Sequence, residues 1–75
     1  MILDKVALAA AERVRATAGP RAALYAFDAL VKNASSDEGR GEAILRGIEC
    51  ALDVRANDDA ARLAALWPQI HSGAW

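Results

Sequence analysis

The sequence predicts an all-α protein, a compact bundle of four short helices arranged as two helical hairpins with the third helix at the centre. Hydrophobic residues make up 55% of the 75 residues, and alanine is the commonest of them. Alanine combines the highest helix propensity with a small apolar side chain. Apolar residues also recur at helical spacing, and glycine, proline or capping residues separate the periodic segments.

The first helix is expected over residues 3–18. An apolar stripe should form its inner face: Leu3, Val6, Ala7, Ala10 and Val14. Polar residues should face solvent: Asp4, Lys5, Glu12 and Arg15. Leu8 lies among them and is expected to be an exposed leucine. Gly19-Pro20 should end this helix and begin the next, because glycine adopts the left-handed closing conformation and proline suits the first helical position.

The second helix is expected over residues 20–33. Its inner face should consist of Ala23, Leu24, Phe27, Leu30, Val31 and Ala34, and its outer face of Arg21, Tyr25, Asp28 and Lys32. Because the connection at Gly19 is so short, the first two helices should form a hairpin.

Residues 35–38 match the pattern that begins a helix. A serine followed three residues later by Glu38 is the capping box, so Ser35 or Ser36 should cap the third helix. Asp37 and Glu38 would stabilise the positive end of the helix dipole, and they would repel a phosphate from the nearby glycines. We therefore expect a capped helix here, with Gly39 and Gly41 leaving its first turn loose, and no phosphate site.

The third helix should be central because it is apolar over more than half of its circumference. One stripe contains small residues, namely Ala43, Gly47 and Ala51. A neighbouring stripe contains large residues, namely Ile44, Leu45, Ile48 and Leu52. We expect the second and fourth helices to cover the large stripe. The first helix should then fill the small-residue groove or leave it open as an interface.

The fourth helix should begin at Asn57, a favourable N-cap, with Asp58 and Asp59 in its first turn. Its inner stripe should be Ala60, Leu63, Leu66, Trp67 and Ile70. Pro68 should distort or end this helix. Residues 71–75 are expected to be a short tail of one domain that spans residues 1–75.

Few residues in the sequence are suited to catalysis. Cys50 is the one cysteine and His71 the one histidine. A Cys50–His71 dyad is one interpretation, and the alternative that we favour is a buried thiol and a solvated imidazole. We expect no enzymatic activity, no cofactor and no metal. The formal net charge is −1, which gives no field to attract nucleic acid or an anionic membrane. A single cysteine and no membrane span or signal peptide lead us to expect a cytoplasmic protein.

The expected function is a small non-enzymatic helical protein–protein interaction module that self-associates or acts as an adaptor or inhibitor. The candidate partner-binding residues are Leu8, Tyr25, Ala43, Gly47, Ala51 and Trp75. A homodimer is expected because so small a domain gains from extra apolar burial, and the alternative is a monomer with Trp75 folded back on the domain. Other functions left open are a nucleic-acid-associated regulator and an accessory subunit of an enzyme.

Overall fold

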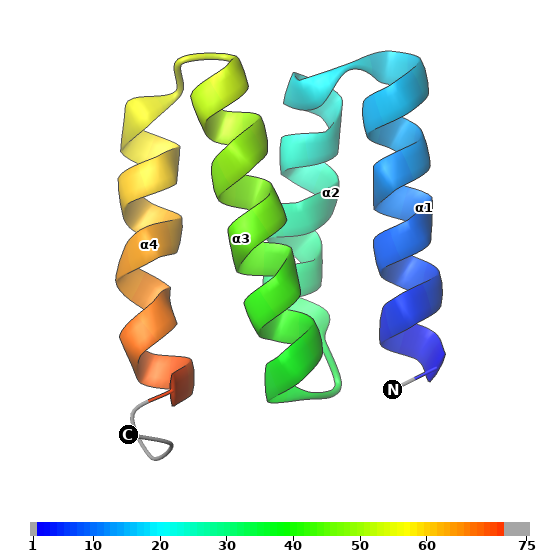
Figure 1. Cartoon of the computed structure of the whole chain (residues 1–75), viewed down its shortest axis with the longest axis vertical. Helices are drawn as coiled ribbons and strands as arrows, with labels where there is room; N and C mark the ends of the chain where they lie inside the picture. Colours follow the sequence, from blue (N-terminus) through cyan, green and yellow to red (C-terminus); the bar gives the residue numbers. More distant parts are fainter. Residues whose placement is uncertain (1, 72–75) are drawn as a thin grey trace.

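Four helices follow one another in the computed structural model, which describes the backbone of residues 2–71 and the side chains of residues 4–67 (Figure 1). They are α1 (Ile2–Ala18), α2 (Pro20–Asn33), α3 (Asp37–Asp53) and α4 (Asn57–His71). The described residues contain no strand, so the predicted all-α class is confirmed. The helix boundaries agree closely with those expected from the sequence.

The helices lie side by side in chain order, each antiparallel to the one before it (Figure 1). The principal-axis extents are 36 × 29 × 15 Å, so the bundle is flat. Among these four helices, α3 is the one that approaches all three others, although its approach to α1 is slight. The predicted central position of the third helix is confirmed.

The three connections are short and locally determined. Gly19 alone joins α1 to α2 with φ 95°, a conformation that favours glycine. At the end of α3, the Ala56 N–H donates to the Ala51 carbonyl (2.7 Å) and the Arg55 N–H to the Leu52 carbonyl (3.1 Å). This pattern is a Schellman motif, and Arg55 occupies its left-handed position with φ 58°. At the other end of the hairpin, α4 continues through Pro68 to His71 rather than ending at the proline.

The core lies between α2, α3 and α4. Its largest fully buried side chains are Phe27, Ile44, Leu63 and Cys50. Gly47 lies at a close approach between the helices of this core, because a Cβ there would lie 2.9 Å from Leu63 Cδ1 and 3.5 Å from Phe27 Cβ. The small-residue groove of α3 is therefore filled inside the chain by α4 and α2 at Gly47. It is neither filled by α1 nor left open as an interface, which were the two alternatives expected.

The expected inner face of α1 is correct only in part, since Ala7, Ala10 and Val14 are half-buried and Val14 packs against the core. Val6, placed on the inner stripe, is 59% exposed, whereas Ala11 and Asp4 are buried. Leu8, expected in solvent, is half-buried and packs against the core. The apolar residues of the first helix are mostly alanines, with large residues scattered among them. The pattern therefore predicts a helix but does not determine which side of that helix is buried.

The large-residue stripe of α3 is only partly covered. Ile44 is fully buried, as expected, and Ile48 is half-buried against the core. Leu45 and Leu52 are 47% and 56% exposed. The expected burial of this stripe therefore holds for Ile44 and not for Leu45 and Leu52.

Candidate interaction surface

Five exposed residues of α3 lie on one face of the helix. They are spaced alternately by four and three residues: Glu38, Glu42, Leu45, Glu49 and Leu52. At 3.6 residues per turn, such spacing keeps all five side chains on one side of the helix. We refer to these five residues as the outer face of α3. The face combines two exposed leucines with three carboxylates.

Two of these carboxylates have no cationic partner. Glu42 accepts from Arg46 Nε at 3.1 Å. Within residues 4–67, neither Glu38 nor Glu49 forms an ion pair or a side-chain hydrogen bond. The outer face of α3 therefore carries uncompensated negative charge beside its exposed leucines.

A groove of about 570 Å³ runs beside this face, between α1 and α3. Its lining residues are Asp4, Lys5, Leu8, Ser36, Glu38, Gly39, Glu42 and Arg46. Glu38 and Glu42 belong to both the groove and the outer face of α3, so the two features form one continuous surface. Leu8 supplies the large apolar side chain of the groove.

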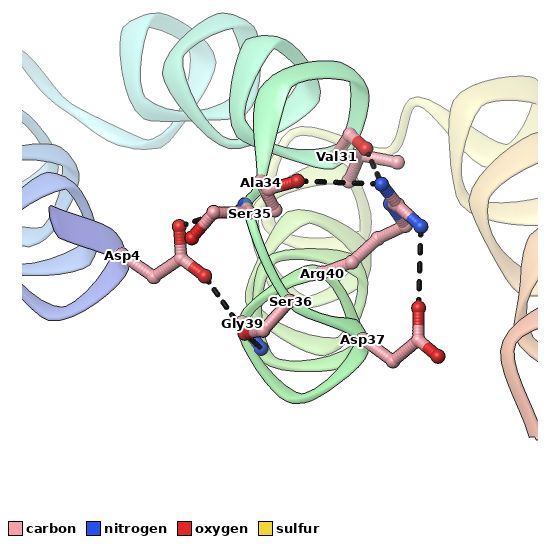
Figure 2. A network of polar contacts seen from close by, with 8 residues as sticks. All are labelled: Asp4, Val31, Ala34, Ser35, Ser36, Asp37, Gly39 and Arg40. Carbon is pink, nitrogen blue, oxygen red and sulfur yellow. Dashed lines mark hydrogen bonds and ion pairs between the residues drawn. The ribbon is translucent and has the colours of Figure 1, made fainter. Parts of the chain in front are cut away.

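Asp4 holds α1 against the start of α3 at one end of the groove (Figure 2). Its carboxylate accepts from the Ser35 backbone N–H (3.0 Å) and from the Ser36 hydroxyl (2.8 Å). These hydrogen bonds, above all that from the Ser35 N–H, stabilise the charged form and lower the pKa of Asp4 to about 2. Sequence analysis placed Asp4 in solvent, because its partners lie more than thirty residues away along the chain.

The start of α3 is capped by Ser36, one of the two serines expected to do so. The Ser36 hydroxyl oxygen accepts from the Gly39 N–H at 3.0 Å. Gly39 is therefore the third helical position, and Glu38 cannot complete the predicted capping box. Asp4 instead accepts from the Ser35 N–H, one residue before the cap, and from the Ser36 hydroxyl itself.

Gly39 is buried in the first turn of α3. A Cβ at this position would lie 2.8 Å from Asp4 Cγ and 2.9 Å from Asp4 Cβ, and it would overlap the carboxylate oxygen. The glycine is needed for this close approach between α1 and α3.

Arg40, in the first turn of α3, donates hydrogen bonds to backbone carbonyls at the C-terminal end of α2 (Figure 2). Its Nε donates to the Val31 carbonyl (3.0 Å) and its Nη2 to the Ala34 carbonyl (3.3 Å). Carbonyls at a helix C-terminus lack intrahelical partners, so the guanidinium satisfies groups that would otherwise depend on water. Asp37 pairs with the same guanidinium at 3.4 Å.

Ion pairs join the helices farther along the bundle. Arg15 of α1 lies 2.6 Å from Asp53 of α3, and Glu12 of α1 lies 3.0 Å from Arg46. Arg62 of α4 pairs with Asp28 of α2 at 2.8 Å. These arginines are held by carboxylates of the same chain, which reduces the positive charge available to an outside ligand.

The six candidate partner-binding residues do not form one surface. Ala43, Gly47 and Ala51 are buried in the core. Tyr25 is 68% exposed on α2, as expected, and Leu8 lies in the groove beside α3. Trp75 lies outside the described residues.

Sequence analysis missed the outer face of α3 as a binding surface. The signal was present in the alternating four- and three-residue spacing of its glutamates and leucines. It was not recognised because Leu45 and Leu52 were assigned to a stripe covered by other helices.

The Cys50–His71 pair is separated by the hairpin geometry. Gly47 lies opposite Leu63, and α3 and α4 run antiparallel (Figure 1). Cys50 follows Gly47 by three residues and His71 follows Leu63 by eight, so the two lie toward opposite ends of the hairpin. Eleven residues of helix place their backbones ~16 Å apart along the axis. Cys50 is fully buried, as expected, and burial raises the pKa of its thiol. This arrangement does not form a nucleophile–base dyad.

The described residues contain no group of three or more side chains suited to hold a metal ion. None of the four helices over residues 2–71 has the length and apolar character needed to cross a membrane. No family model matches the chain, and neither a curated protein nor a solved structure matches it.

Proposed function

We propose that this chain is a small, non-enzymatic helical protein–protein interaction module that binds a partner protein through the outer face of α3. The observation that carries the proposal is the pair Leu45 and Leu52, which are 47% and 56% exposed on one side of α3. Single exposed leucines are ordinary, but two at a seven-residue interval beside a groove match the anchor spacing used in helix recognition. The binding mechanism would be recognition by a helix face.

The expected homodimer is less well supported by this geometry. It depended in part on an open groove at Gly47, and Leu63 and Phe27 approach that position within the chain. Two copies that met through their outer faces would bring like charges together. We therefore favour a different protein as the partner.

The nucleic-acid alternative also finds little support. Arg15, Arg46 and Arg62 are each paired with carboxylates. The unpaired carboxylates of the outer face would repel phosphate groups. A cytoplasmic location remains part of the proposal, because Cys50 is a free thiol, and free thiols are typical of reducing compartments.

Site-specific photo-crosslinking in the native host tests the proposed function. A photoreactive amino acid is placed at Leu52 and, as the control, at the exposed Ala16 of α1. We expect a discrete cross-linked protein from position 52 that is absent from position 16. A second Leu45→Ser substitution should remove that product. Identical cross-linking patterns from the two positions would contradict the proposal.

A further inference from the structure

We propose that the partner presents a basic amphipathic α-helix, which lies along the outer face of α3 with leucine-sized side chains over Leu45 and Leu52. This inference rests on the proposed function and specifies the chemistry of the bound segment. Its support comes from the length of the face, from its charge and from the adjacent groove.

The length of the face suits a helix of about four turns. From Glu38 to Leu52 the face extends ~21 Å along α3, at 1.5 Å per residue. Leu45 and Leu52 are separated by ~10 Å on the same scale, which is two helical turns. A facing helix with apolar residues at the same seven-residue interval would bring its side chains over both leucines.

The charge of the face selects a basic partner. Glu38 and Glu49 lie on the same side of α3 as Leu45, and neither has an ion-pair partner in residues 4–67. Lysine or arginine beside the apolar anchors of a bound helix would compensate these carboxylates. A neutral helix would cover the leucines but leave the glutamates unpaired at the interface. An acidic helix would place like charges beside them.

The groove extends this recognition toward α1. It contains Leu8 together with three carboxylates, Asp4, Glu38 and Glu42, and two cations, Lys5 and Arg46. Arg46 is paired with Glu12 and Glu42, and Asp4 is held by the serines. A long basic side chain could therefore place its methylene groups near Leu8 and its charge near Glu38.

The same charges argue against a second copy in this position. In a symmetric dimer each outer face would meet an identical face, so the unpaired glutamates would lie near one another. Like charges brought together at an interface disfavour the complex.

The experiment uses two synthetic helical peptides that differ only in charge. Both carry leucine at apolar positions spaced by three, four and seven residues. One has lysine at the flanking positions, and its matched control has glutamate. Binding to the full chain is followed by amide chemical shifts in NMR and by calorimetry. We expect the lysine peptide to shift amides of residues 38–52 and to bind more weakly as salt rises, and the glutamate peptide to leave them unchanged.

Substitutions in the chain locate the interaction. The double substitution of Glu38→Gln and Glu49→Gln should weaken binding of the lysine peptide about 3- to 10-fold, which is the range expected for two exposed ion pairs. Leu45→Ser with Leu52→Ser should abolish binding. Asp58→Asn removes one exposed carboxylate from α4, away from the face, and should leave affinity unchanged. Equal effects of Asp58→Asn and of the glutamate substitutions would overturn the inference.

Three other results would overturn it as well. They are equal binding of both peptides, concentration-dependent self-association that Leu45→Ser removes, and nuclear Overhauser contacts between the Trp75 indole and Leu45 in the free protein. The second result would identify a copy of the chain as the occupant, and the third would identify the chain's own terminal segment. If position 52 still cross-links a partner in the host, the proposed function survives while the basic-helix inference fails.

Discussion

Asp4 in the first turn of α1 lies against Gly39 in the first turn of α3, so closely that a Cβ on Gly39 would be 2.9 Å from Asp4 Cβ. The Asp4 carboxylate reaches past the glycine to Ser35 and Ser36 (Figure 2). This contact fixes one end of α1 to α3, and the Arg15–Asp53 ion pair fixes a point nearer the other end.

Gly39→Ala should destabilise the protein, although alanine is the better helix former. The added methyl group would meet Asp4 inside a closely packed junction, and such overpacking costs about 1–3 kcal/mol. Urea denaturation measures the loss. In an Asp4→Gly background, where the opposing side chain is absent, the same substitution should become neutral or stabilising. An unchanged penalty in that background would show that the contact with Asp4 is not its cause.

Asp4 should make the stability depend on acid pH. Its pKa in the folded chain is about 2 against an ordinary value of 3.8, so the unfolded chain binds the proton more readily. The stabilisation is present above pH ~4 and is lost as the pH falls toward 2. The wild-type melting temperature should exceed that of Asp4→Asn at pH 6, and the difference should shrink below pH 4. A difference that is constant from pH 6 to pH 2 would contradict this assignment.

Gly47→Leu should unfold or strongly destabilise the chain. The position faces Leu63 and Phe27, both fully buried, and neither can move into solvent without opening the core. We expect the free energy of unfolding to fall by about 1–3 kcal/mol or more. Sedimentation and denaturant unfolding together check this prediction. Weaker self-association with unchanged stability would instead indicate that the Gly47 groove is open to a partner.

Arg55→Gly should stabilise the protein by about 0.5–1 kcal/mol. Arg55 occupies a left-handed conformation at the end of α3, which costs a residue with a side chain about 1–2 kcal/mol. Part of this gain is offset because glycine is more flexible in the unfolded chain. The denaturation midpoint measures the effect. Arg55→Ala is the control, because alanine keeps the Cβ and should bring no gain.

Local sequence determined where the helices begin and end. Gly19 and Pro20 end α1 and begin α2, and Ser36 caps α3. Each acts through its own backbone or through a residue three positions away, so the relevant physics is contained in a few neighbouring residues. The inner face of α2 could also be predicted, because Phe27 and Leu24 are much larger than the alanines around them.

Only the tertiary structure decided which faces of α1 and α3 are buried. In α1 the candidate faces differ by little apolar area, and the burial of Asp4 depends on serines of a distant segment. In α3 the small and large stripes are both apolar, and burial of either one is favourable. Close packing around Gly47 turned the small stripe inward and left Leu45 and Leu52 exposed. The candidate site could not be predicted from periodicity alone, because its exposure depends on how closely α2 and α4 approach α3.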